Sequence, residues 1–427
     1  MSLSRFPDKP EVLLKSLFDT AVEAAQPERC IAKHLPHRPQ GRTIVVGFGK
    51  GAAAMASALE AEWDGPLEGV VVTRYGHEVP CKHIRVLQAA HPVPDQAGIE
   101  ATKEILEATK GLSEDDLVIC LISGGGSALF VQPPEGVTLE EKQDLTKQLL
   151  ASGAPIGKIN IVRRHLSLAK GGRLAEACAP ASVVSLIISD VPGDDLEAIA
   201  SGPTVPDPST RDDALAILGR YRIPPSPAIE AYLESPKSET PGPDAACFEK
   251  VLNRLIATPM MSLDSAASLA DAKGVSTSIL GDSIEGETRD VAREQAGMVM
   301  EIIEGRTDTQ LPCVLLSGGE TTVTLTGNGR GGPNTEYALS LAIALDGLPG
   351  VYAIACDTDG VDGSEDNAGA LVMPDTLERA KALGLDPEAY LNNNDSYSFF
   401  ERLGDLVITG PTHTNVNDFR AILITKT

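Results

Sequence analysis

The sequence predicts a two-domain α/β protein, and three features of its 427 residues lead to this fold class. A chain of this length exceeds what one ordinary hydrophobic core organises. Short apolar runs alternate with helical stretches, which is typical of a parallel sheet covered by helices on both faces. A proline-rich stretch near the middle of the chain then separates two such series of elements.

The first series opens with a helix over residues 11–25, in which apolar side chains recur at helical spacing. Four apolar runs follow as predicted strands, at residues 43–46, 69–73, 117–122 and 182–189. The first strand leads through GFGKG into a helix, the third into SGGGSALF, and the fourth into DVPGDD. Because ligands of parallel sheets bind beyond the carboxyl ends of the strands, these turns are candidate site segments.

The proline-rich stretch PPSPAIEAYLESPKSETPGPD is expected to be a surface connection, so we place the domains at residues 1–245 and 246–427. The second series contains NRLIAT, VSTSILGD, CVLLSGGETTVTL, VYAIACDTDGVDG and DLVITG as its apolar runs. A strand therefore runs into Ser-Gly-Gly once in each domain. We expect each of these glycine-rich turns to line one wall of a cleft that holds phosphate.

The net charge, the cysteines and the apolar runs of the sequence limit the partners and the cellular location that we expect. Sixty acidic residues against 36 Lys and Arg give a net charge of −24, which excludes nucleic acid and anionic membranes as expected partners because both require a basic face. Seven scattered cysteines without a CxxC pair indicate reduced thiols. No signal-peptide pattern and no apolar run of membrane-spanning length is present, so we expect a cytoplasmic protein.

The stretch VVGFGKGAAAMA fits the permissive dinucleotide pattern G-x-G-x-x-A, with Gly47, Gly49 and Ala52 at its fixed positions. Arg74 stands where that pattern expects an acidic residue. Lys50 adds a cation inside the turn, and backbone N–H groups, a helix start and an ammonium together form an anion site. The alternative is a tight strand–helix junction with a solvated lysine.

SGGGSAL matches neither a P-loop nor a nucleophile elbow, because Leu129 occupies the last position of G-x-S-x-G. Ser127 is therefore not expected to be a covalent nucleophile. Ser123, Ser127 and the glycines between them more plainly offer hydroxyls and backbone donors to an oxyanion.

KINIVRRHLSLAKGGRLAEA gathers possible cations in an otherwise acidic chain: Arg163, Arg164, His165, Lys170 and Arg173. A solvated helix face is one interpretation. The other is that some of them bind carboxylate or phosphate, for which arginine is suited by its bidentate geometry.

Two acidic clusters follow predicted strands. Asp190 opens DVPGDD, and Asp357 opens DTDGVDG. The second lacks the spacing of an EF-hand, and oxygen ligands shared with phosphates favour Mg²⁺ over structural calcium. Either cluster could instead be turn chemistry, since Asp and Gly dominate turns. The stretch THTNVND near the C-terminus fits sugar-like hydroxyls or a tightly bonded turn.

In their order along the chain, these stretches resemble the class II glycerate kinases, whose C-terminal part is called the MOFRL domain. The resemblance rests on GFGKGAAAMA, AAHPVPDQAG, LISGGGSAL, NIVRRHLSLAKGGRLA, ISDVPGDDLEAIASGPTVPDPST, SGGETTVTLTGNGRGGPNTE, DTDGVDGSEDNAGA and GPTHTNVND. It implies a Rossmann-like N-terminal domain, a smaller α/β domain and an active site in the interdomain cleft. It also implies phosphorylation of D-glycerate by MgATP to 2-phosphoglycerate. Relatives are often labelled hydroxypyruvate reductases.

By this resemblance Lys50 is the catalytic lysine of the first turn. The family's second catalytic cation is an arginine in a stretch that reads GRGGPNTE here, where Pro333 takes its position and Arg330 becomes the candidate. Asp190 is expected to bind Mg²⁺ or orient the glycerate hydroxyl, with Asp357 as the lesser metal candidate. Arg163 or Arg164 would bind the glycerate carboxylate, and Ser123 and Ser127 would help to hold the acceptor or the phosphates.

The residues expected at the nucleotide are mainly glycines of the turns: Gly49, Gly124, Gly125, Gly126, Lys170, Gly318, Gly319, Asn334 and Asn415. ATP and Mg²⁺ are the expected cofactors, small molecules the expected partners, and a homodimer is an open possibility. Two alternatives remain: a reductase of hydroxypyruvate that uses NAD(P)H, and a non-catalytic sensor of phosphorylated hydroxy acids.

Overall fold

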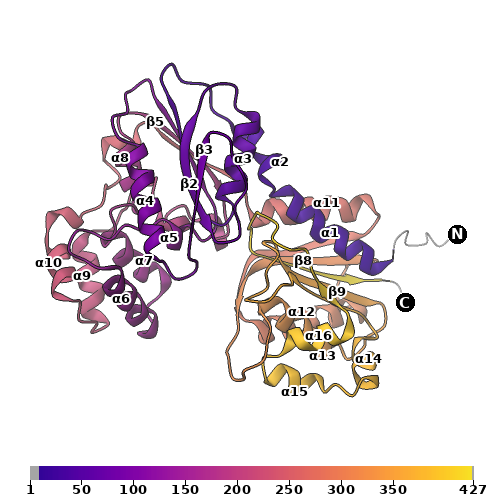
Figure 1. The fold of residues 1–427 in the computed structure, drawn as a ribbon. Helices are drawn as coiled ribbons and strands as arrows, with labels where there is room; N and C mark the ends of the chain where they lie inside the picture. The colour runs from indigo at the N-terminus through magenta and orange to yellow at the C-terminus, as the bar shows by residue number, and fades with distance from the viewer. Residues whose placement is uncertain (1–8, 426–427) are drawn as a thin grey trace. The chain divides into compact units, whose positions relative to one another are not determined.

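The computed structural model describes residues 9–425 and divides into two compact units, each of which is an α/β assembly around one sheet (Figure 1). The first unit is Pro27–Ile256. The second combines the segment that ends at Gln26 with the segment that begins at Ala257.

The sheet of the first unit has the strand order β3-β2-β1-β4-β5-β6, which is the order of a Rossmann fold. Its neighbours from β3 to β5 pair in parallel. The strands are β1 (Thr43–Phe48), β2 (Glu68–Arg74), β3 (Ile84–Ala89), β4 (Leu117–Ile122), β5 (Ser182–Ile188) and β6 (Val251–Ala257). β1 and β4 are buried at every position, as strands covered on both faces are. The predicted parallel sheet is confirmed.

Helices of the first unit connect these strands or form a separate cluster beside the sheet. The cluster packs α6, α7, α9 and α10 around buried Leu145, Val162, Ile217 and Leu233. The helices are α2 (Pro27–Cys30), α3 (Ala52–Glu62), α4 (Gln96–Ala108), α5 (Gly126–Leu129), α6 (Leu139–Ala151), α7 (Ile156–His165), α8 (Arg173–Cys178), α9 (Arg211–Arg220) and α10 (Pro227–Glu234). Short 3₁₀ turns are η1 (Ile31–His34), η2 (Pro192–Asp194), η3 (Ile199–Ser201), η4 (Pro236–Ser238) and η5 (Ala246–Phe248).

Several of these helices begin where local chemistry favours a start. The Thr138 hydroxyl accepts from the Glu141 N–H while the Glu141 carboxylate accepts from the Thr138 N–H, which is a capping box for α6. Thr210 and Asp213 do the same for α9. Ser226 caps α10 with Pro227 at its first position.

The proline-rich stretch is not a surface connection, contrary to the sequence prediction. It contains α10, whose Ile229 and Leu233 are buried in the helical cluster of the first unit. Because these two residues are four apart, they lie on one face of a helix despite the polar residues between them. NRLIAT likewise forms β6 at the edge of the first sheet instead of opening the second series. The first unit therefore ends at Ile256, whereas the predicted domain boundary lies between residues 245 and 246.

The sheet of the second unit is mixed, with the order β11-β10-β9-β12-β8-β7. Only β7 and β8 pair in parallel, and the other neighbours are antiparallel. The strands are β7 (Ser276–Glu287), β8 (Cys313–Thr322), β9 (Val351–Asp357), β10 (Gly369–Val372), β11 (Leu406–Val407) and β12 (Asp418–Ile424). The helices are α1 (Pro10–Ala24), α11 (Pro259–Ala272), α12 (Thr288–Ile303), α13 (Pro333–Leu345), α14 (Thr376–Ala382), α15 (Pro387–Asn392) and α16 (Ser396–Leu403).

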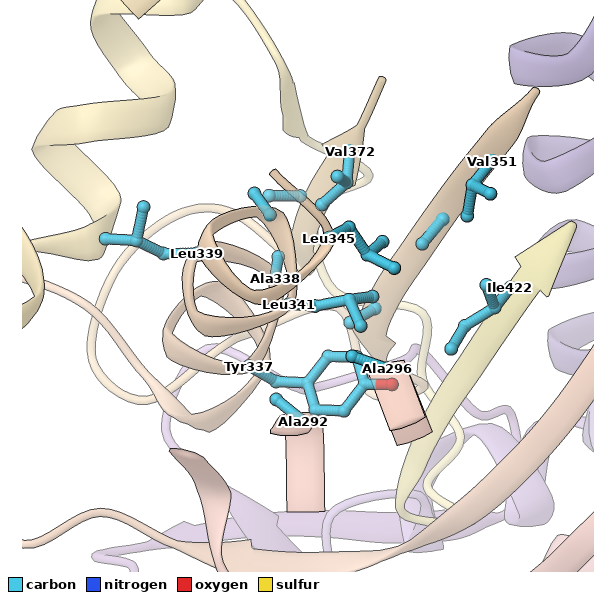
Figure 2. Close-up of a cluster of buried hydrophobic side chains, with 14 of the residues drawn as sticks. Ala292, Ala296, Tyr337, Ala338, Leu339, Leu341, Leu345, Val351, Val372 and Ile422 are labelled. Carbon is cyan, nitrogen blue, oxygen red and sulfur yellow. The ribbon is translucent and has the colours of Figure 1, made fainter. Parts of the chain in front are cut away.

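Alternate residues of this sheet enter two different cores, as the two-residue period of a strand requires. Val314 and Leu316 of β8 pack with α1 and α11, whereas Leu315 packs with α12 and α13 on the other face. Figure 2 shows part of the second core, with Tyr337 and Leu341 of α13 on the side that faces the strands. The predicted N-terminal helix is thus confirmed as α1, and it belongs to the second unit.

Among residues 9–425, none of the helices combines the length and the apolar character that a membrane-spanning helix needs.

Candidate functional site

The turn that carries Lys50 is locked against the glycine-rich turn of the neighbouring strand. β1 ends at Phe48, two residues beyond the predicted end of this strand, and α3 begins at Ala52, as the sequence predicts. The Lys50 N–H donates to the Gly124 carbonyl at 2.8 Å, and the Gly51 N–H donates to the Ser123 hydroxyl at 2.9 Å. These hydrogen bonds join the two predicted site segments into one structure.

Glycine is required at Gly49 for two reasons. Its φ of 132° lies outside the range that other residues adopt readily, and a Cβ here would overlap the Ser123 hydroxyl. The two turns can therefore approach this closely only because Gly49 has no side chain. Lys50 itself is half-buried at the centre of the contact.

His91 is a third member of this site that the sequence analysis quoted but did not assign. It follows β3, and its ring lies so close to Gly125 that a Cβ there would be 2.9 Å from the ring atom Nε2. The same Cβ would be 3.3 Å from Cγ of Lys50. Gly125 has φ 78°, so it serves both the turn and the approach of these two side chains. The rule that sites lie at strand carboxyl ends could have singled out His91, because it comes two residues after β3.

The long loop after β5 contacts the same turn and is strained. Ala200 and Ser201 have φ values of 51° and 65°, which are unusual for residues with a side chain. The Ser201 hydroxyl lies 2.8 Å from the Ser127 hydroxyl, and the Gly171 N–H donates to the Ser201 carbonyl at 3.0 Å. Strain of this kind clusters at functional sites, where the surroundings hold it in place.

Asp190 lies two residues after the end of β5 at Ile188, close to its predicted position at a strand end. β5 pairs with β4, and β4 pairs with β1, all in parallel. The carboxyl ends of the three strands therefore carry Lys50, Ser123 and Asp190 along one edge of the sheet.

Three further cations lie close to the glycine-rich turn: Lys142, Arg163 and Lys170. Lys170 is 1% exposed, and its Nζ donates to the Ser127 carbonyl at 2.7 Å. Lys142 is 7% exposed and donates to the Leu166 carbonyl. The sequence analysis singled out Arg163 and Lys170 but missed Lys142, whose position in a polar amphipathic helix gives no local signal.

Burial and mutual repulsion oppose the charges of these groups. Burial, followed by the nearby Arg163, lowers the pKa of Lys142 to about 7. Burial also lowers the pKa of Lys170 well below its ordinary value, with smaller contributions from Arg163 and Lys142. A bound anion would relieve this repulsion.

Arg164 has a different role from the substrate contact expected for it. Its side chain is buried, its Nε donates to the Asp207 carboxylate at 2.8 Å, and its Nη2 donates to Ser209 at 3.4 Å. Asp207 is also buried and accepts from Thr240. The guanidinium is therefore part of a buried ion pair, so of the two arginines we retain Arg163 for the substrate.

The second Ser-Gly-Gly is not a turn, and this corrects the sequence prediction. β8 runs without interruption through Ser317, Gly318 and Gly319. Gly319 has φ 118°, and a Cβ on it would overlap the backbone of Ile284 in β7, where the strand pairing shifts register. The glycines thus allow close approach of neighbouring strands. Their assignment to the nucleotide stays a prediction without a turn to support it.

Arg330 and Pro333 lie in the second unit. The guanidinium of Arg330 is 2.7 Å from the Glu365 carboxylate and 4.2 Å from the centre of the Tyr397 ring. Its pKa is raised, mainly by the hydrogen bond to Glu365. Pro333 is the first residue of α13, where its fixed φ favours a helix start.

Asn334 follows Pro333 and takes part in a buried network. Its side-chain amide donates to Asp418 at 2.7 Å, and its backbone N–H donates to Asp362 at 2.8 Å. Burial raises the pKa of Asp362 to about 6. The side chain of Asn334 is 1% exposed, so in this network it holds the start of α13 in place. Asn415 is also buried and accepts from the Asn417 N–H at 3.1 Å.

No group of three or more His, Cys, Asp and Glu side chains suited to a metal ion occurs within residues 9–425. Mg²⁺ is commonly held by one or two carboxylates together with substrate phosphates. Asp190 is a carboxylate near the carboxyl end of β5, on the same edge of the sheet as the Lys50 turn, and it fits that mode of binding. Asp357 ends β9 in the second unit, where its carboxylate accepts from the Asp359 N–H at 2.9 Å.

Residues 13–234 match a domain of unknown function, DUF4147, and residues 313–418 match the MOFRL family. A D-glycerate 2-kinase from Thermotoga maritima is 44% identical over 96% of this chain and 98% of its own length. A protein from Agrobacterium vitis, named as a candidate hydroxypyruvate reductase, is 52% identical over 96% of this chain and 94% of its own length. The crystal structure of a glycerate kinase from Thermotoga maritima matches with a TM-score of 0.90 at 44% identity, covering 97% of this chain and 100% of that one.

Proposed function

The chain belongs to the glycerate kinase family, and we propose that it transfers the γ-phosphate of ATP to the 2-hydroxyl of D-glycerate. The products are then 2-phosphoglycerate and ADP. The 44% identity to a D-glycerate 2-kinase along nearly the whole chain supports both the acceptor and the position of transfer.

The observation that carries this proposal is the position of Lys50. It sits in a turn held by hydrogen bonds to Ser123 and Gly124, at the edge of the sheet where parallel strands present their ligands. Phosphoryl transfer requires mainly positioning and the neutralisation of negative charge. A cation fixed by a rigid turn supplies both without reorganising during the reaction.

In the transfer step, the 2-hydroxyl oxygen of glycerate forms a bond to the γ-phosphorus of ATP. The bond between that phosphorus and the β–γ bridging oxygen breaks, and ADP leaves with the electron pair. Lys50 stabilises the charge on the transferred group. The hydroxyl proton passes to a carboxylate, for which Asp190 is our candidate. Arg163 binds the carboxylate of glycerate.

Mg²⁺ bound to ATP would neutralise charge on its β- and γ-phosphates. If Asp190 does not accept the proton, it is the residue that we expect to hold this ion, with Asp357 as the alternative. Ser123, Ser127 and the backbone of the turn between them orient the phosphates through hydroxyl and N–H donors.

The test is the release of ADP from ATP in the presence of D-glycerate, L-glycerate or no acceptor. We expect ADP release that depends on D-glycerate and on Mg²⁺. Oxidation of NADH or NADPH by hydroxypyruvate, without ADP release from ATP and D-glycerate, would contradict the proposal and favour a reductase. Thermal stabilisation by these ligands without either reaction would favour a sensor.

A further inference from the structure

A pocket of about 300 Å³ lies in the first unit beside the glycine-rich turn. Small-molecule sites begin at about this size. Its lining includes Ser127, Lys142, Arg163 and Lys170, so the three cations described above converge on one space.

The charge of the pocket is unusual for this protein. Among the residues that the structure describes, no Asp or Glu lines the pocket, although the whole chain carries a net charge of −24. Lys142 and Lys170 are almost fully buried, and within the described residues both donate to backbone carbonyls and not to carboxylates. Two buried lysines and an arginine that lack a carboxylate partner among the described residues favour a ligand that carries several negative charges, because such a ligand favours the protonated lysines.

The rest of the lining is mainly apolar. Val93 and Leu150 are 57% and 59% exposed, and Leu139, Val131 and two prolines lie with them. Gln143, Thr146 and Lys147 complete the lining. Large apolar side chains exposed at a pocket indicate a ligand with a flat or apolar part. The ligand therefore combines a polyanion with an apolar ring system.

We propose that this pocket holds the donor nucleotide, with its phosphates against Lys142 and Lys170 and its base against Val93, Leu139 and Leu150. Arg163 also lines the pocket and keeps its proposed contact to the carboxylate of glycerate. The inference deepens the proposed function and rests on it, because it takes a nucleotide as the phosphate donor.

The pocket adjoins the reaction site through two shared segments. Ser127 lines the pocket and belongs to the glycine-rich turn that is bonded to the Lys50 turn. Pro92 to Pro94 form a wall of the pocket directly after His91, whose ring lies against Gly125. Phosphates in the pocket thus lie beside the turn that holds Lys50.

Two variants of the full-length enzyme test the two halves of the inference. Leu150→Trp fills the apolar part, and Ile156→Trp is its matched control because Ile156 is 62% exposed and lies outside the lining. Lys142→Met removes one cation, and Lys103→Met, an exposed residue of α4, is its control. The measurements are the Kd for ADP by calorimetry, the KM values for ATP and D-glycerate, and the melting temperature.

We expect Leu150→Trp and Lys142→Met each to raise the Kd for ADP and the KM for ATP on the order of tenfold. The KM for D-glycerate and both control variants should stay near wild type. ADP binding that is unchanged in both variants would overturn the inference. Loss of binding in Lys142→Met alone would overturn the placement of the base and indicate an anion site.

The two proposals fail in different ways. If the wild type binds ADP, the variants weaken that binding and yet no glycerate is phosphorylated, the proposed function is wrong and the pocket assignment stands. If glycerate is phosphorylated and the variants leave the KM for ATP unchanged, the pocket assignment is wrong and the proposed function stands.

Discussion

Lys50 shows how a single residue obtains its function from its neighbours. A lysine on a surface loop is mobile and solvated, whereas this one is half-buried between two turns that glycines allow to touch. The backbone on both sides is fixed by bonds to Ser123 and Gly124. The turn that carries this cation is therefore already fixed before the substrates bind, and the catalytic role that we propose for Lys50 rests on that preorganisation.

Replacing Lys50 should abolish most activity without unfolding the protein. We expect Lys50→Ala to lower kcat on the order of a hundredfold or more, the scale seen when one preorganised donor is lost. The measurement is steady-state ADP release together with the melting temperature. Lys103→Ala is the control, since Lys103 is exposed on α4. A kcat within about twofold of wild type would contradict the role of Lys50.

The burial of Lys142 predicts how the free energy of unfolding depends on pH. Its pKa falls from 10.5 to about 7 in the folded protein, chiefly through burial and then through Arg163. Between these values the unfolded chain binds a proton that the folded chain does not, so the free energy of unfolding rises with pH. Lys142→Met removes this contribution. Urea denaturation between pH 7 and pH 10 should therefore show wild type gaining stability relative to Lys142→Met, and parallel profiles would count against a buried, uncharged lysine.

At the scale of elements, the same tripeptide, Ser-Gly-Gly, adopts different structures in the two units. Ser123-Gly124-Gly125 forms a turn after β4, whereas Ser317-Gly318-Gly319 lies inside β8. The first follows an apolar run that ends the strand, and its Gly125 takes a left-handed φ of 78°. The second is paired with β7 and β12 on its two sides, so the sheet overrides the tendency of glycine to turn.

Gly319 should tolerate no side chain because the strands approach closely there. Gly319→Ala should lower the free energy of unfolding by about 2 kcal/mol or more, since its φ is positive and the Cβ would overlap the backbone of Ile284. Gly297→Ala is the matched control in α12, where a Cβ meets no atom within 4 Å. That control should stabilise the protein by up to about 1 kcal/mol. Denaturant titration of the wild type and both variants gives the free energies of unfolding. Equal values for Gly319→Ala and Gly297→Ala would refute the close approach of the strands at Gly319.

Local sequence reasoning was sufficient for elements whose signals are local. The turn at Lys50 and the position of Asp190 could be predicted, because apolar runs followed by Gly or Asp mark strand ends. Lys142 and His91 could not be assigned in this way. Their importance comes from residues about thirty positions away, Lys170 and Gly125, and only the fold brings these together.

At the scale of the whole molecule, the chain does not divide into two continuous halves. α1 is the first helix of the sequence, yet Leu14 and Phe18 are buried against the sheet that the C-terminal half forms. Sequence patterns predicted the helix and its apolar face. They could not tell which sheet that face covers, because amphipathicity specifies burial but not the partner.

Because α1 packs on the second sheet, a destabilising substitution in α1 should increase hydrogen exchange in that unit. Leu14→Ala should cost about 2–5 kcal/mol because the side chain is fully buried. Hydrogen exchange should accelerate in α11, β9 and β12, which α1 contacts, and stay unchanged in β1 and β4. Val12→Ala is the control on the exposed side of the same helix. Faster exchange confined to β1 and β4 would contradict the assignment of α1 to the second unit.

The function that we propose is the phosphorylation of D-glycerate at its 2-hydroxyl by ATP. A single reaction that contains the protein, Mg²⁺, ATP and D-glycerate, followed by ³¹P NMR, tests both the reaction and the position of transfer. We expect the resonance of 2-phosphoglycerate to grow in step with that of ADP, and almost no growth with Lys50→Ala. An unchanged ATP spectrum, or 3-phosphoglycerate as the first product, would contradict it.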